Sequence, residues 1–331
     1  MTSVQQATTQ ERTLDELLNI GHNPFETRMG PIPETIGGIR ADGREFAGGN
    51  IVHRLRLEAL QSGDRDRIMQ AVGNKHYDLA DASITFEDLL KLQPDSHLLK
   101  GIRGVVETQD GLYVAIDANS VNAALKNEGM KYFTVRGSET VNYRTKEGEL
   151  KQETALDVVL LPYNRNSVKF TPDQFRAINA TELRRKDLAC DRDLAQEEIV
   201  RDGKVVHPAW AIYPAEIIAP LVAETFKFNK REWDYDKNMG FFLPGEPTDN
   251  AEMRALYVGR LWGMSWLDGW GGLGKDRSHL VGAGGKYAAG APQKLAPGEI
   301  DLLTAARRKD SVLHIAGESY VKTAVPVQPK Q

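Results

Sequence analysis

The stretch VVETQDGLYVAI, residues 105–116, decides the fold class of this 331-residue chain. Two segments rich in apolar residues, 105–108 and 112–116, flank the turn-forming triplet Gln109-Asp110-Gly111. β-Branched and aromatic residues on both sides of such a turn are typical of a β-hairpin. The pattern therefore predicts strands in the middle of the chain.

More elements are predicted on the C-terminal side of this hairpin. They are a helix at residues 120–127 and strands at residues 131–136, 140–145, 149–154 and 157–161. Lys146-Glu147-Gly148 lies between two of these strands and predicts a second hairpin. Residues 157–161, DVVLL, are apolar enough for a central strand.

The first hundred residues are predicted to be mainly helical. Helices are expected at residues 13–20, 50–60, 68–72 and 85–92. Thr85 with Asp88 resembles a capping pair for the last of these helices. Residues 24–49 contain three prolines and six glycines and are expected to stay irregular.

The C-terminal half begins with a strong helix signal, Thr171-Pro172-Asp173-Gln174, which combines a capping residue, proline and glutamine at the preferred positions. Acidic and basic residues alternate over 182–202, which favours a solvated helical face. Residues 199–206 predict a short hairpin. Residues 215–226 predict a buried helix with a kink at Pro220.

Residues 250–268 predict a long helix that is apolar around most of its circumference, so a core or a partner must enclose it. The predicted class is therefore α+β: a helical N-terminal part packed with a mainly antiparallel sheet, and a C-terminal helical, glycine-rich segment. We expect an arm with a short helix at 1–22, one domain over 23–318 with a possible sub-boundary near residue 170, and a tail at 319–331.

The composition excludes several classes of protein. Hydrophobic residues make up 41% and charged residues 27%, as in ordinary globular chains. The 42 basic and 46 acidic side chains nearly cancel, so there is no strong nucleic-acid signal. The chain shows no cleavable signal and no membrane span, and Cys190 is its single cysteine. We expect a cytoplasmic protein, or one delivered into another cell without a cleavable signal.

All five tryptophans lie between residues 210 and 270, and the last three are spaced by four: Trp262, Trp266 and Trp270. On the predicted helix this spacing places them on one face. They form either an aromatic core cluster or an aromatic wall for a ligand or a protein partner.

A glycine-rich stretch with basic residues, 269–286, follows the tryptophans. Its first seven residues fit a phosphate-binding P-loop, but Asp276 occupies the eighth position, where the motif requires Ser or Thr. The alternatives are a flexible anion-binding loop and a structural loop. The candidate ligand-binding residues are Trp266, Trp270, Gly272, Gly274, Lys275, Arg277, His279 and Lys286.

Other catalytic motifs are weaker. The seven histidines lack the spacing of a zinc protease, and no metal or cofactor is expected. Ser265 lacks the closing glycine of a nucleophile elbow. We expect Cys190 to be structural and His207 to be a hydrogen-bonded core residue.

Two hypotheses of function follow. The first is an assembly or protein-interaction protein, with self-association or a protein partner at the tryptophan region. The second is a transferase or hydrolase that binds a small anionic, phosphate-bearing substrate at residues 269–286.

Overall fold

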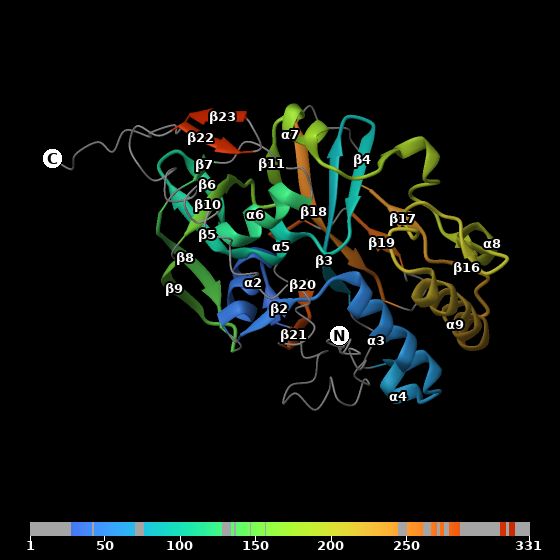
Figure 1. Cartoon of the computed structure of the whole chain (residues 1–331). Helices are drawn as coiled ribbons and strands as arrows, with labels where there is room; N and C mark the ends of the chain where they lie inside the picture. The colour runs from blue at the N-terminus through green and yellow to red at the C-terminus, as the bar shows by residue number, and fades with distance from the viewer. Residues whose placement is uncertain are drawn as a thin grey trace, which may run out of the picture.

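Antiparallel strand pairing organises most of the chain into two sheets, which Figure 1 shows side by side. The computed structural model describes residues 28–41, 43–69, 76–127, 134–135, 137–145, 147–155, 157–243, 250–260, 266–269, 272–274, 278–284, 312–315 and 318–321. Within these residues, one sheet has nine strands and the other has six. Helices pack on both sheets, so the predicted α+β class is confirmed.

The nine-stranded sheet is built around two long antiparallel strands, β3 (Tyr77–Phe86) and β18 (Ala251–Val258). Its other strands are β1 (Arg28–Gly30), β4 (Leu89–Gln93), β11 (Val168–Phe170), β12 (Glu182–Arg184), β17 (Phe241–Phe242), β19 (Leu267–Asp268) and β20 (Ser278–Leu280). The main path runs β1-β20-β3-β18-β19-β17. β4 also pairs with β3, β12 pairs with β4, and β11 pairs with β18.

The six-stranded sheet has the order β7-β10-β6-β5-β8-β9. Its strands are β5 (Ile102–Thr108), β6 (Gly111–Asp117), β7 (Thr134–Val135), β8 (Glu139–Arg144), β9 (Leu150–Ala155) and β10 (Val158–Pro162). Both predicted hairpins of this region are confirmed, as β5–β6 and β8–β9. Gly111 has φ +137°, a value that favours glycine, directly after the first turn. The predicted strand at 157–161 is also confirmed, because β10 lies between two neighbours.

Helices and short ladders surround the sheets. The α-helices are α2 (Ile32–Ala41), α3 (Gly49–Gln61), α4 (Arg65–Ile68), α5 (His97–Lys100), α6 (Ala118–Asn127), α7 (Pro172–Ala177), α8 (Gln196–Ile199) and α9 (Ala215–Trp233). The short ladders are β13 (Leu194–Ala195) with β16 (Lys237–Asn238), β14 (Val200–Arg201) with β15 (Lys204–Val205), β2 (Arg44–Phe46) with β21 (Gly282–Gly284), and β22 (Val312–Ile315) with β23 (Glu318–Val321). The predicted helices at 120–127 and 215–226 are confirmed as α6 and α9, and Pro220 lies inside α9.

The predicted start of α7 is confirmed in detail. The Thr171 side chain accepts a hydrogen bond from the Gln174 backbone, and the Gln174 side chain accepts one from the Thr171 backbone. The other end of α7 is held by Lys91 of β4, whose buried ammonium donates to the carbonyls of Phe175, Arg176 and Ile178 at 3.1, 3.3 and 2.8 Å. Charge-assisted bonds of this kind satisfy carbonyls that a helix end leaves without a partner.

The nine-stranded sheet is buried on both faces, by a different hydrophobic core on each. On one face, Tyr77 and Leu79 of β3 join a core with α3 and α9, the helices that lie together in Figure 1. On the other face, Ala82 and Ile84 join a core with the six-stranded sheet. Successive residues of β3 alternate between these two cores, as the two-residue period of a strand requires.

The predicted helix at 250–268 is wrong. Residues 251–258 are β18, which pairs with β3, β11 and β19. A strand buried on both faces carries apolar residues on both and can lose the alternating pattern, so apolar residues on every side do not indicate a helix here. Leu267 and Asp268 form β19, and residues 261–265 lie outside the described residues.

The predicted helix at 85–92 is also wrong, because β3 and β4 form a hairpin whose turn is Glu87-Asp88. The run of charge at 182–202 is not one helix either. It contains β12, a 3-10 turn (Arg185–Asp187), β13 and the short α8. In both places, pairing with a distant strand overrides the local helical pattern.

The segment expected to be irregular contains α2. Gly37 shows what a glycine contributes to this helix: a Cβ on Gly37 would lie 2.0 Å from the Arg103 carbonyl oxygen of β5. The missing side chain lets the helix approach the six-stranded sheet closely. The predicted helix at 50–60 corresponds to α3. The helix predicted at 68–72 overlaps α4 only at Ile68, and residues 70–75 and 13–20 lie outside the described residues.

Of the described helices, none combines the length and the apolar character needed to cross a membrane.

Candidate functional site

One row of side chains crosses five neighbouring strands of the nine-stranded sheet at the end where β3 begins. Strand register places Leu280 of β20 beside Asp78, Asp78 beside Tyr257 of β18, Tyr257 beside Asp268 of β19, and Asp268 beside Phe242 of β17. Directly paired residues share a face of the sheet. Two carboxylates therefore flank one tyrosine, and an aromatic ring follows at the edge of the sheet.

The centre of this carboxylate row, Asp78–Tyr257–Asp268, is linked by a short hydrogen bond. The Tyr257 hydroxyl donates to Asp268 Oδ2. Burial, and then the negative charge of Asp268, raise the pKa of Tyr257 far above its usual value. The phenol is thus a neutral hydrogen-bond donor across the physiological range. Tyr257 is half-buried, whereas both carboxylates are almost fully buried.

Trp266, a predicted site residue, lies immediately before β19 at the same edge of the sheet. Its indole N–H donates to Asp193 Oδ1 at 2.9 Å, and its ring packs on Phe242 with centroids 4.3 Å apart. All three residues are half-buried. We call this group the aromatic edge: Trp266, Phe242 and Asp193. Trp266 is not on a helix, and Trp262 and Trp270 lie outside the described residues, so the stacking of three indoles stays a prediction.

The described part of the glycine-rich stretch is packed tightly against a turn at residues 164–167. The Leu273 N–H donates to the Asn166 carbonyl at 2.8 Å, and the Leu273 carbonyl accepts from the Ile32 N–H at 2.7 Å. A Cβ on Gly272 would lie 2.9 Å from Asn166 Oδ1, and one on Gly274 would lie 2.1 Å from the Arg165 carbonyl oxygen. These glycines therefore allow close packing between segments, as expected of a structural loop.

The other predicted site residues divide into two groups. His279 lies on β20 and is half-buried. It is paired with Tyr77, on the face of the sheet opposite to Asp78 and Asp268. Those not described by the structure are Trp270, Lys275, Arg277 and Lys286. The anion-binding loop thus remains a prediction from the sequence.

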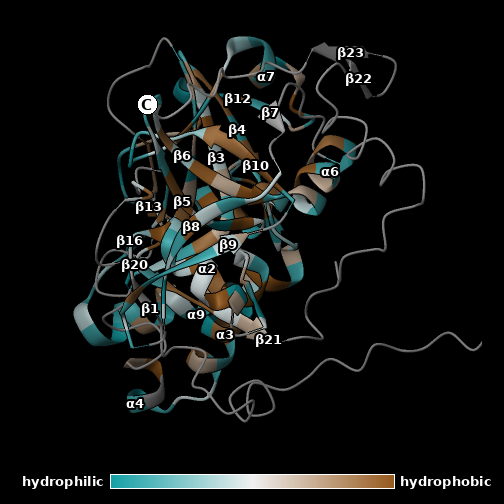
Figure 2. Cartoon of the chain, turned by 90° about the vertical axis from the view of Figure 1, so that its left-hand side faces the viewer, coloured by the Kyte–Doolittle hydropathy of each residue, from teal (hydrophilic) through white to brown (hydrophobic). Residues whose placement is uncertain are grey.

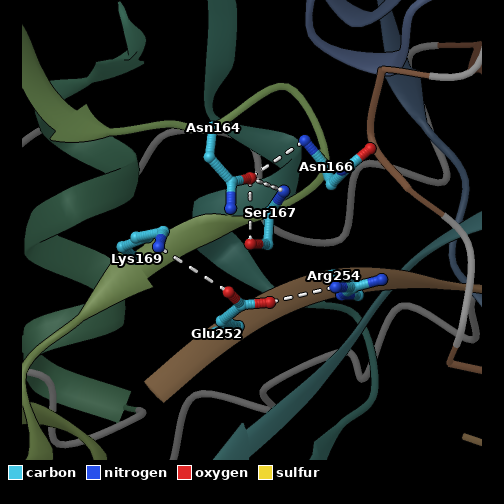
Figure 3. Close-up of polar contacts among 6 residues, drawn as sticks. All are labelled: Asn164, Asn166, Ser167, Lys169, Glu252 and Arg254. Carbon is cyan, nitrogen blue, oxygen red and sulfur yellow. Dashed lines mark hydrogen bonds and ion pairs between the residues drawn. The ribbon is translucent and has the colours of Figure 1, made fainter. Parts of the chain in front are cut away.

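The turn at 164–167 leads into a second polar group, which Figure 3 shows between β11 and β18. Glu252 contacts Lys169 Nζ at 3.9 Å and Arg254 Nη2 at 3.0 Å, and its side chain is 8% exposed. The neighbouring Asn164 Oδ1 accepts hydrogen bonds from the Asn166 and Ser167 backbone N–H groups and from the Ser167 hydroxyl. This group joins β11 to β18 and was not foreseen from the sequence.

A third polar group surrounds a fully buried carboxylate near the start of α3. The Asp81 carboxylate of β3 accepts hydrogen bonds from the Tyr213 hydroxyl at 2.6 Å, the Gly49 N–H at 2.8 Å and the Asp95 N–H at 2.7 Å. Burial raises the pKa of Asp81 to about 6 although these three donors lower it. The His53 ring packs edge-on against Tyr213, with centroids 4.6 Å apart. We call Asp81, Tyr213 and the two backbone donors the Asp81 knot.

Two smaller predictions can be compared with the structure. His207 is buried, and its Nε2 donates to the Leu188 carbonyl at 2.9 Å, so the predicted hydrogen-bonded core residue is confirmed. Burial raises the pKa of the Cys190 thiol to about 11, which disfavours the reactive thiolate. Among the described residues, no group of three or more His, Cys, Asp or Glu side chains could hold a metal ion.

Asp78, Tyr257 and Asp268 were not foreseen from the sequence. Each belongs to a different strand, and the bulge between Ala255 and Tyr257 sets which residues of β18 face them. The one available signal was the pair of acidic residues in the otherwise apolar YDLADA segment, residues 77–82.

Comparisons with known proteins add little. No family model and no curated protein matches this chain. A solved chain from work on how the C-type lectin fold accommodates massive sequence variation in Nanoarchaeota is 12% identical, over 74% of this chain and 90% of that chain, with a TM-score of 0.37. A likeness at this TM-score assigns neither a fold family nor a function to this chain.

Proposed function

We propose that this chain is an interaction protein that binds a partner protein through the aromatic edge, Trp266, Phe242 and Asp193. The observation that carries the proposal is the half-buried Trp266 ring packed on Phe242 at the rim of the nine-stranded sheet. Tryptophan is among the residues most enriched at the energetic centres of protein interfaces.

The internal contacts of Trp266 support this role. Its N–H already donates to Asp193, so a partner can cover the ring without leaving a buried donor unsatisfied. Phe242 and Leu267 belong to paired strands, which hold the aromatic edge in one orientation. A pre-ordered aromatic surface loses little conformational entropy when it binds.

The alternative, an enzyme for an anionic substrate, receives less support. Asp78 lies on β3, next to β20, and Asp268 lies on β19, next to β18. Both are close to where residues 269–286 join the sheet. Buried carboxylates there disfavour a phosphate group. The cytoplasmic location and the lack of a cofactor also remain predictions from the sequence.

A differential capture experiment tests the proposal. The wild-type chain and Trp266→Ala would be used as baits in extract from the producing cell, with bound proteins quantified by mass spectrometry. Trp233→Ala is the matched control, because Trp233 is also half-buried and packs on a phenylalanine, Phe228, at 5.4 Å on α9.

We expect a partner recovered with the wild type and Trp233→Ala to fall at least about tenfold with Trp266→Ala, the effect of losing an interface anchor worth about 1.4 kcal/mol or more. Circular dichroism would verify that all three baits are folded. Equal recovery with all three baits would contradict the proposal.

A further inference from the structure

β9 is the outermost strand of the six-stranded sheet. Figure 1 shows it at the margin of the molecule, and Figure 2 shows its outer side facing the viewer. It pairs with β8 on one side, and no described strand pairs with its other side. Leu150 is 57% exposed, and Lys151, Gln152 and Thr154 are exposed as well. A row of backbone N–H and C=O groups is therefore open to another strand.

The side chains of β9 are complementary to those of a second β9. When two copies run antiparallel about a two-fold axis through Gln152, Lys151 of each copy lies opposite Glu153 of the other. Leu150 then lies opposite Thr154 on the other face. Opposite charges that face each other across paired strands stabilise them.

This register is distinguished from its neighbours by charge. Moving the axis to Lys151 places two lysines opposite each other, and moving it to Glu153 places two glutamates opposite each other. Like charges in directly opposed positions destabilise a strand pair. Charged edge strands ordinarily prevent unspecific pairing, and here the same charges favour the arrangement about Gln152 over the two arrangements centred on Lys151 and Glu153.

Among the described residues, the ion pair that β9 makes is a weak one. Lys151 Nζ lies 3.9 Å from Glu149 Oε2, and these side chains are 55% and 69% exposed. An exposed pair at this distance contributes little and exchanges readily for a better partner.

We propose that two copies of this chain associate through β9, which joins two six-stranded sheets into one continuous sheet with a two-fold axis at Gln152. Five residues of β9 in each copy, 150–154, face one another, so the interface is small, polar and reversible. This self-association is independent of the aromatic edge and its partner.

Charge reversal tests the pairing. Lys151→Glu places two glutamates opposite each other and Glu153→Lys places two lysines opposite each other, each at two symmetric positions. The double variant Lys151→Glu/Glu153→Lys restores both opposite-charge pairs. Sedimentation equilibrium over a concentration series should show a dimer for the wild type and the double variant, with association weakened at least about tenfold in each single variant.

Cross-linking gives a second readout that does not depend on charge. Gln152→Cys places two thiols beside the axis, where opposed Cα atoms lie about 5 Å apart, within the range of a disulfide. Thr154→Cys is the matched control: it lies on the same face and is equally exposed, but its two copies are about 13 Å apart along the strands.

Under mild oxidation Gln152→Cys should form covalent dimers, whereas Thr154→Cys and the wild type with Cys190 should not. A wild type that stays monomeric at every concentration would overturn the proposal. So would a dimer that persists unchanged in both single charge variants, or equal cross-linking of the two cysteine variants.

Discussion

Two tyrosine–carboxylate pairs, each with its carboxylate on the nine-stranded sheet, share their chemistry and differ in access to solvent. In the Asp81 knot both partners are buried, and three donors from separate segments converge on one carboxylate. In the carboxylate row, Tyr257 is half-buried and lies one strand away from Trp266. The comparison indicates that the first pair holds the scaffold together, whereas the second borders a surface that is open to binding.

The largest expected effect is at the Asp81 knot. Asp81→Ala removes the acceptor of three donors: the buried Tyr213 hydroxyl and Gly49 N–H, and the partly buried Asp95 N–H. Leaving buried donors without a partner should lower the free energy of unfolding by about 4 kcal/mol. Urea denaturation followed by circular dichroism would measure the loss. A loss below about 1 kcal/mol would mean that Asp81 does not hold these segments together.

The pH dependence of stability should separate the Asp81 knot from the surface. Burial raises the pKa of Asp81 in the folded chain from its ordinary value of 3.8 to about 6, so the folded state binds this proton more tightly than the unfolded chain does. The extra stability is complete below about pH 4 and is lost as the pH rises through about 6. On acidification across this window, the free energy of unfolding of the wild type should rise by up to about 3 kcal/mol relative to that of Asp81→Asn. Parallel pH profiles of the two proteins would contradict the account.

Removing the two phenolic hydroxyls compares the tyrosine pairs directly. Tyr213→Phe should lower the free energy of unfolding by about 2 kcal/mol, because the hydroxyl donates a hydrogen bond to a fully buried carboxylate. Tyr257→Phe should cost about 1 kcal/mol, because water reaches the half-buried ring more easily. Denaturant unfolding midpoints give both values if the dependence of the unfolding free energy on denaturant concentration is unchanged. A larger loss for Tyr257→Phe than for Tyr213→Phe would contradict the distinction between the two pairs.

The smallest effect is expected at the aromatic edge. Asp193→Ala removes one hydrogen bond to Trp266, whose N–H is close enough to solvent to bind water instead. The unfolding free energy should fall by only about 0.5 kcal/mol. A much larger loss would show that the aromatic edge supports the fold and is not simply a binding surface.

Local signals in the sequence predicted the elements whose structure is decided locally. The turn triplet at 109–111 and the capping residues Thr171 and Gln174 define their own hydrogen bonds, so the β5–β6 hairpin and the start of α7 could be foreseen. β18 could not be foreseen, because its strand conformation depends on pairing with β3, which is far away in the sequence.

The candidate site was predictable only in part. The unusual concentration of tryptophans drew attention to Trp266, which does lie at the aromatic edge. The carboxylate row depends on the register of three strands and on the bulge in β18, so Asp78 and Asp268 could not be brought together from the sequence. Gly272 and Gly274 drew attention as a phosphate cradle, but a glycine that serves close packing produces the same pattern.

The most direct test of the division between scaffold and surface combines stability and binding in one pair of variants. Recovery of the captured partner would be measured for Asp81→Asn and Trp266→Ala at a temperature at which both remain folded by circular dichroism. We expect Asp81→Asn, though less stable, to recover the partner as the wild type does, and Trp266→Ala to recover at least about tenfold less. Loss of the partner with Asp81→Asn and normal recovery with Trp266→Ala would contradict it.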